Sequence, residues 1–107
     1  MRLQTLQLLY SAIRIAAPLV RKIANKDPEL ARQIRRAMNS AVLQCAEGNY
    51  ARGRNRNAKL RGAYGEASEA RAGFEAAAAW GDITEKEAQE IDDILDHACA
   101  QLWKLSR

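Results

Sequence analysis

Hydrophobic side chains return every three or four residues along most of the chain, the spacing that places them on one face of an α-helix. Only two prolines and six glycines interrupt this pattern. The pattern predicts helices over about 3–25, 28–47, 57–80 and 85–105. The sequence therefore favours an all-α protein.

Residues with strong preferences for helix ends separate these segments. Asp27 is expected to cap the second helix, and Thr84 with Glu87 has the spacing of a capping box before the last one. Gly48 is the residue type expected just after a helix end. Residues 48–56 are therefore predicted to form the one substantial loop.

Two details of the helix boundaries stay open. Pro18 removes a backbone donor inside the first predicted helix, which favours either a kink or a complete break after Ala17. Asn55 and Asn57 are both suitable caps for the third helix.

Four helices joined by short connections pack best when consecutive helices run in opposite directions. We therefore expect a single domain over 1–107, an antiparallel up-down-up-down four-helix bundle. Much of the apolar content is alanine, which buries little area, so we expect close helix packing or oligomerisation to add to the stability of the core. Leu43, Trp80 and Trp103 fall outside the predicted inner faces and are predicted to form subunit contacts.

The predicted second helix carries an ordered polar edge beside its apolar face. If it pairs with the third helix around the loop, Arg36 lies opposite Glu69. We interpret these two residues, with Ser40, Glu47 and Gly48, as a structural seam in which an ion pair sets the register. A Glu47 and Glu69 carboxylate pair acting in acid–base catalysis is the alternative.

Charge is distributed unevenly between the two parts of the chain. Residues 1–61 hold 13 Lys and Arg against three Asp and Glu, whereas residues 62–107 hold four against ten, so the parts carry +10 and −6. This asymmetry indicates a basic surface for an anionic partner, or two complementary surfaces that meet.

The densest basic segment coincides with the predicted loop and the start of the third helix. It has no acid between Asn49 and Arg61, and its cations are Arg52, Arg54, Arg56, Lys59 and Arg61. Tyr50 adds a ring that could stack on a base. The segment is predicted to bind RNA or DNA through phosphates. The alternatives are a solvated loop and a contact with the acidic flank of the last helix in a neighbouring subunit.

No catalytic, metal or cofactor site is expected. Cys45 and Cys99 lie inside helical patterns and are interpreted as buried small side chains, and His97, the single histidine, is predicted on the surface. Three acids on one flank of the last helix are interpreted as solvated rather than as cation ligands: Glu85, Asp92 and Asp96. The N-terminal segment lacks a continuous apolar core, so we expect a cytoplasmic protein without a membrane span.

Several short segments over about residues 28–107 form a recognisable signature. They are Gln33-Ile34-Arg35-Arg36-Ala37, Ser40, Ala46-Glu47-Gly48, Ala63-x-Gly65, Glu69, Gly81-Asp82-Ile83-Thr84 and Leu102-Trp103-x-Leu105. This signature resembles the four-helix-bundle protein family of 23S rRNA intervening sequences, to which the accessory proteins of diversity-generating retroelements are related. The chain departs from it at Gln44, Glu66, Arg56 and Lys59, where the family has Asn, Ser and aromatic residues.

The resemblance implies a cytosolic four-helix bundle that assembles as a ring-like homopentamer without enzymatic activity. The retroelement branch binds nucleic acid and a reverse transcriptase, which implies the same partners here if the gene lies in a retroelement. We therefore expect a non-enzymatic, nucleic-acid-binding accessory protein. The alternative is a protein-interaction module whose basic half contacts the acidic surface of neighbouring subunits.

Overall fold

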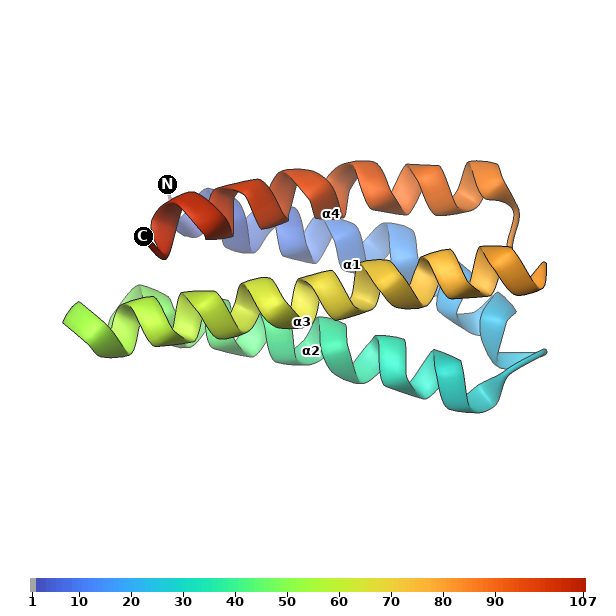
Figure 1. Cartoon of the computed structure of the whole chain (residues 1–107), viewed down its shortest axis with the longest axis horizontal. Coiled ribbons are helices and arrows are strands. Elements are labelled where there is room, and N and C mark those ends of the chain that lie inside the picture. The colour runs from blue at the N-terminus through green and yellow to red at the C-terminus, as the bar shows by residue number, and fades with distance from the viewer. Residues whose placement is uncertain (1) are drawn as a thin grey trace.

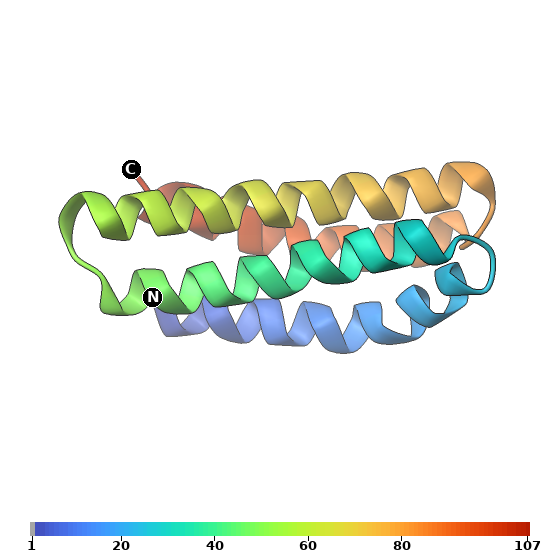
Figure 2. The same ribbon diagram turned by 90° about the horizontal axis from the view of Figure 1, so that it is seen from below.

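The computed structural model describes residues 2–107, which form four helices and no strand. The helices are α1 (Arg2–Ala24), α2 (Pro28–Tyr50), α3 (Gly53–Trp80) and α4 (Glu85–Leu105). Figures 1 and 2 show them lying side by side along the long axis. The packed pairs are α1 with α2, α2 with α3, α3 with α4, and α4 with α1, so the four helices enclose one core.

The core fills the bundle from end to end, because each helix directs one apolar stripe inward. Phe74 of α3 is its largest fully buried side chain. Around it, α3 contributes mainly alanines, which allow the neighbouring helices to approach closely. The fully buried leucine and isoleucine side chains of the four helices are Leu9, Ile23, Ile34, Leu60, Ile91, Leu95 and Leu102. The inward faces expected from the hydrophobic spacing are therefore confirmed.

Helix α1 is continuous through Pro18, so the predicted alternative of a complete break after Ala17 is wrong. Pro18 is exposed, where the proline ring meets solvent instead of the core. From Leu3 to Ala24 this helix is long and apolar enough to cross a membrane by length and composition alone. In the structure it forms one wall of the bundle and buries Leu9, Ile23 and the residues between them that face inward.

The connection between α2 and α3 differs from its prediction. Helix α2 continues through Gly48 to Tyr50, and α3 begins at Gly53, so only Ala51 and Arg52 separate them. The predicted loop over 48–56 is therefore wrong, and so are the asparagine caps, because Arg52 occupies the cap position without a side-chain hydrogen bond. The left-handed residue of the turn is Gly53, with a φ of 62°.

Gly48 has a packing role rather than the predicted role at a helix end. It is buried inside α2, and a Cβ atom there would lie 2.8 Å from Cδ2 of Leu60 on α3. The helix can continue through Gly48 because no left-handed backbone is needed there, whereas any larger residue would push α3 away.

The other predicted helix ends are confirmed. The Asp27 carboxylate accepts a hydrogen bond of 3.0 Å from the backbone amide of Leu30. Thr84 and Glu87 form the expected capping box, with reciprocal bonds of 2.8 and 3.0 Å. Helix α3 ends at Trp80, and Gly81 follows it in the left-handed conformation with a φ of 85°.

The polar seam between α2 and α3 is present in the predicted register. Arg36 Nη2 lies 3.0 Å from Glu69 Oε2, and the Ser40 hydroxyl donates to Glu66 Oε2 at 3.0 Å. The ion pair is a surface feature, since its side chains are 61% and 52% exposed, and such pairs contribute about 0–1 kcal/mol to stability. Further along, Glu47 lies 3.5 Å from Lys59.

Each seam carboxylate therefore has a cationic partner of its own. Glu69 is paired with Arg36 and Glu47 with Lys59, so the two acids serve different ion pairs along the helix interface. This arrangement supports the structural interpretation of the seam over the carboxylate-pair alternative.

Glycines on α3 also contribute to this register, through steric fit rather than charge. A Cβ atom at Gly73 would lie 2.5 Å from Cγ1 of the buried Ile34, and one at Gly62 would overlap the amide of Gln44. Side chains of α2 therefore fill the space that these glycines leave. The register of α2 against α3 therefore depends on the fit of these side chains as well as on the ion pairs.

Replacing Gly73 by alanine is expected to lower the free energy of unfolding by about 1–3 kcal/mol, because Ile34 must move within a packed core. Gly65→Ala is the matched control, since Gly65 is an exposed glycine of the same helix and a Cβ atom there would have no neighbour within 4 Å. That substitution is expected to stabilise by about 0.5–1 kcal/mol through helix propensity. Urea unfolding followed by circular dichroism measures both, and equal effects would contradict the steric account of the seam.

Candidate nucleic-acid interface

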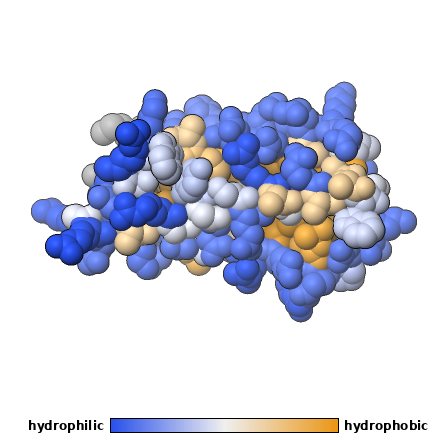
Figure 3. Space-filling model, in the orientation of Figure 1, coloured by the Kyte–Doolittle hydropathy of each residue, from blue (hydrophilic) through white to orange (hydrophobic). Residues whose placement is uncertain are grey.

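The predicted basic residues gather at one end of the bundle, where α2 turns into α3. The carboxyl end of α4 lies at the same end, as Figures 1 and 2 both show. Strongly hydrophilic side chains dominate this end in the space-filling view, whereas hydrophobic surface is visible toward the opposite end (Figure 3). The surface that these residues form is therefore polar and open to solvent.

Two hydrogen bonds join the basic segment to α4. Arg56 Nη1 donates to the carbonyl of Leu105 at 2.9 Å, and Arg61 Nη1 donates to that of Ser106 at 3.2 Å. The basic segment therefore belongs to a structured helix end and not to a loop.

Arg56 and Arg61 act as caps for α4. The last carbonyls of a helix lack partners within it and carry the negative end of its dipole, so guanidinium groups stabilise them. Arg56 is half-buried and also donates to Asn57 Oδ1 at 3.0 Å. Lys59 is engaged with Glu47, as described above. Three of the five predicted phosphate ligands thus have structural partners within the chain.

Arg52 and Arg54 differ from those three. Both are exposed, and neither forms an ion pair with any residue in the described range 2–107. Tyr50 is 89% exposed beside them. A hollow of about 600 Å³ lies at this turn, between Asn49 and Arg56.

The start of α3 adds further donors to this hollow. Its first turn contains no acid, and its cap residue makes no side-chain hydrogen bond. The first amide groups of a helix have no partner within it, and they carry the positive end of the dipole. The turn therefore offers two free guanidinium groups together with backbone donors, a combination that suits phosphate oxygens.

The predicted loop over residues 48–56 placed Arg56 outside a helix, whereas it lies in the first turns of α3. A helical signal was available: Arg56 lies four residues before the buried Leu60, and therefore on nearly the same helix face. The contribution of α4 to this end was also missed. Its last residues include Lys104 and Arg107, two of the four cations in the acidic part of the chain.

The residues predicted as subunit contacts are all exposed. Leu43 is 63%, Trp80 79% and Trp103 52% exposed. Leu43 lines a surface hollow of about 570 Å³ on α2 together with three arginines, Arg32, Arg35 and Arg36. Trp103 differs from the other two because it packs against Tyr64, with ring centroids 5.6 Å apart.

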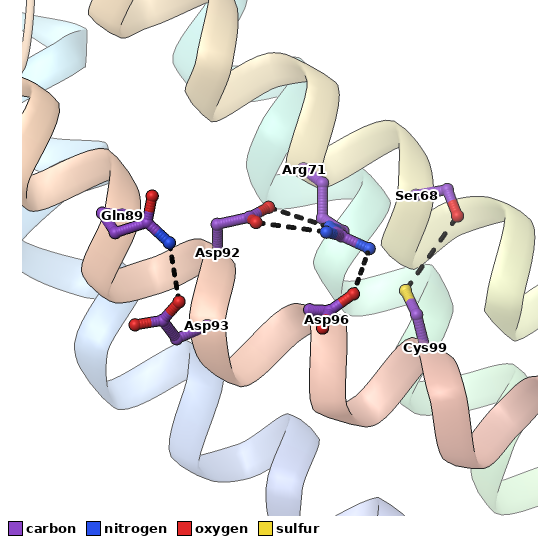
Figure 4. Close-up of polar contacts among 7 residues, drawn as sticks. All are labelled: Ser68, Arg71, Gln89, Asp92, Asp93, Asp96 and Cys99. Carbon is purple, nitrogen blue, oxygen red and sulfur yellow. Dashed lines mark hydrogen bonds and ion pairs between the residues drawn. The ribbon is translucent and has the colours of Figure 1, made fainter.

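Two acids on the flank of α4, Asp92 and Asp96, share one arginine of the same chain. Arg71 of α3 makes a two-pronged contact with Asp92, with Nε–Oδ1 and Nη2–Oδ2 distances of 2.8 and 3.1 Å. Its third nitrogen lies 3.2 Å from Asp96 (Figure 4). The hydrogen bond to Asp92 raises the pKa of the Arg71 guanidinium above its usual range. Asp92, 25% exposed and held by two nitrogens, is therefore an ion-pair partner rather than the solvated acid that the sequence suggested, whereas Asp96 is 68% exposed and Glu85 is also exposed, as expected.

The cysteines are buried, as predicted, and both are free. Burial raises the pKa of the Cys45 thiol to about 11, and burial is also the main reason that the pKa of the Cys99 thiol is raised. Both remain protonated at neutral pH and are poor nucleophiles. Across residues 2–107, no group of three or more His, Cys, Asp and Glu side chains is placed to hold a metal ion.

Arg56→Ala is expected to lower the free energy of unfolding by about 1–2 kcal/mol, because it removes a charged hydrogen bond from the end of α4. Arg54→Ala is the matched control, with the same change in charge at an exposed position, and its effect should stay within about 0.5 kcal/mol. Chemical denaturation of the two variants tests the division between structural and free arginines. Equal destabilisation by both would contradict it.

Comparison with known proteins shows the fold but gives no activity. The structure matches a crystal structure of a protein of unknown function from the S23 ribosomal protein family of Bacteroides thetaiotaomicron, with a TM-score of 0.85. The match covers 96% of this chain and 98% of the other, at 22% sequence identity. No family model and no curated protein matches the chain. What the two proteins demonstrably share is therefore a four-helix fold over their whole length.

Proposed function

We propose that this protein is a non-enzymatic accessory protein that binds RNA or DNA through its phosphates at the α2–α3 turn. The observation that carries the proposal is the pair of exposed, unpaired arginines, Arg52 and Arg54, beside the uncapped start of α3. Phosphate contacts of this kind position a nucleic acid without reading its sequence. The recognition is therefore expected to be independent of base sequence.

The distribution of ion pairs supports the same assignment. On α1 and α2, Arg14, Arg21 and Arg35 are also exposed without an ion-pair partner in the described part of the chain, so unpaired positive charge is not confined to the turn. Three acids of α4 have cations of the same chain as partners, since Asp92 and Asp96 contact Arg71 and Glu87 contacts Lys22. The lysine contact is the main reason that the pKa of the Glu87 carboxyl is lowered.

This distribution also bears on the alternative of a protein-interaction module. In that alternative, the basic turn of one subunit contacts Asp92 or Asp96 of the next. Asp92 is held by two nitrogens of Arg71, so a contact there would compete with an arginine of its own chain, whereas the side chain of Asp96 is 68% exposed and accessible to a neighbouring subunit. The exposed arginines at the start of α3, and not the pairing of these acids, favour nucleic acid as the partner.

We further propose membership of the family of 23S rRNA intervening sequences, with an antiparallel bundle that assembles in the cytoplasm as a ring-like homopentamer. The seam supports the antiparallel arrangement, because partners on α3 fall in number, from Glu69 to Lys59, as those on α2 rise from Arg36 to Glu47. The S23-family neighbour supports the family. A reverse transcriptase is a further partner if the gene lies in a retroelement.

Reversing the charge of the free arginines, in Arg52→Glu/Arg54→Glu, is expected to weaken binding to a fluorescent 20-nucleotide RNA at least tenfold at low salt. The dependence of log affinity on log salt should also become shallower, by about 0.7 for each phosphate of a single strand that the variant no longer neutralises. Fluorescence anisotropy over a series of salt concentrations measures both quantities.

Lys26→Glu/Lys86→Glu is the matched control for that experiment. It changes the net charge by the same amount at exposed residues near the opposite end of the bundle. If binding and its salt dependence were the same in both double variants, net charge alone would explain the affinity and the assignment to the α2–α3 turn would be wrong.

The molecular mass of the assembly in solution tests the proposed pentamer. Light scattering after gel filtration is expected to give five times the 11.9 kDa chain mass, and Leu43→Glu is expected to reduce it by placing a charge at the subunit contact. Leu3→Glu is the control, since Leu3 is also exposed and lies near the start of α1. A monomeric wild-type protein at micromolar concentration would contradict the proposed assembly.

A further inference from the structure

An aromatic groove lies between α3 and α4 beside the basic end of the bundle. It has a volume of about 400 Å³, and its walls include Tyr64 and Arg71 from one helix and Trp103 and Lys104 from the other, with Arg107 at its rim. Figure 4 shows how Arg71 bridges the two helices in the neighbouring part of this interface. The groove is therefore a feature of packed helices and does not depend on a loop.

Trp103 is positioned in this groove and still accessible. Its ring contacts Tyr64 at a centroid distance of 5.6 Å and an interplanar angle of 50°, while half of the residue, 52%, remains exposed. The Arg107 guanidinium carbon lies 6.0 Å from the Trp103 ring centroid, within the range of a cation–π contact. An indole held by a second ring, with a cation over one of its faces that a stacking base would displace, has the features of a platform for a planar ligand.

The free charge of the groove is positive. The one acid in its lining is Asp96, which is paired with Arg71. Lys104 and Arg107 form no ion pair with any residue in the part of the chain that the structure describes. A ligand that combines a flat apolar face with negative charge therefore matches both the rings and the cations of this groove.

The groove and the α2–α3 turn belong to one surface. Arg56 and Arg61 hydrogen-bond to the carbonyls of Leu105 and Ser106, which directly follow Trp103 and Lys104 in the chain. These contacts fix the end of α4 against the start of α3. The basic start of α3 and the residues around the Trp103 ring therefore lie at the same end of the bundle.

We propose that Trp103 stacks on an unpaired base of a single-stranded nucleic acid whose phosphates contact Lys104, Arg107 and the free arginines of the α2–α3 turn. This inference rests on the proposed function and adds a preference for single strands over duplexes. In a duplex each base face is covered by its neighbours, so the groove has no ring to bind. It also assigns Trp103 to the ligand instead of to the subunit contact that the sequence suggested.

Trp103→Ala is expected to weaken binding to a uridine 15-mer about tenfold, within the range for loss of one base-stacking contact. Trp80→Ala is the matched control, since Trp80 is more exposed and lies at the opposite end of α3. The Trp80→Ala variant should bind the uridine 15-mer with the affinity of the wild type. A blunt 15-base-pair RNA duplex should bind wild type and Trp103→Ala equally.

Two further variants separate stacking from loss of structure. Trp103→Phe is expected to restore most of the affinity and Trp103→Leu is not, because only the former keeps an aromatic face. In a Trp80→Phe background Trp103 is the only tryptophan, so stacking should quench its fluorescence on addition of the uridine 15-mer and not on addition of the duplex. A thymidine 15-mer distinguishes preference for RNA from general single-strand binding.

The outcomes also distinguish this inference from the function on which it rests. If the uridine 15-mer and the duplex both bind with a steep salt dependence and Trp103→Ala binds as tightly as the wild type, stacking is wrong while phosphate binding stands. If no nucleic acid binds at low salt, both proposals fail. If Trp103→Ala instead reduces the mass of the assembly, Trp103 is a subunit contact and the stacking assignment is overturned.

Discussion

The close approach of α2 to α3 is the constraint on which the rest of the structure depends. Gly48 receives Leu60, and Gly62 and Gly73 receive side chains of α2, so each helix leaves space that the other fills. This contact fixes the register in which Arg36 meets Glu69. It also fixes where α3 begins, and therefore where the basic turn and its arginines stand relative to the end of α4.

The helices and their inner faces could be predicted because they follow from local chemistry. Asp27 and the Thr84–Glu87 box signal helix starts through bonds to residues three positions away. The α2–α3 connection could not be predicted in the same way. A glycine favours a helix end in an isolated chain, but at Gly48 the packing of Leu60 against its backbone outweighs that preference. Only knowledge of the partner helix would have shown this.

The sequence predicted where the candidate site lies, but it predicted only part of what each basic residue does there. The cations between Arg52 and Arg61 do share one end of the bundle, but a sequence does not show which of them have partners far along the chain. Arg56 and Arg61 are committed to carbonyls more than 40 residues away, which leaves Arg52 and Arg54 for a ligand. The same contacts bring Trp103 to the basic surface, although it lies in the acidic part of the sequence. A single end of the bundle thereby combines unpaired arginines, helix caps and an aromatic ring.

Amide hydrogen exchange with and without a uridine 15-mer tests the central claim most directly, because it reports where along residues 2–107 the ligand acts. The account predicts added protection in the first turn of α3 and in the last turns of α4, around Trp103, with little change near Trp80 and Glu85 at the opposite end. Protection confined to the Trp80–Glu85 end, or spread evenly over all four helices, would contradict the assignment of the nucleic-acid interface to the basic end of the bundle.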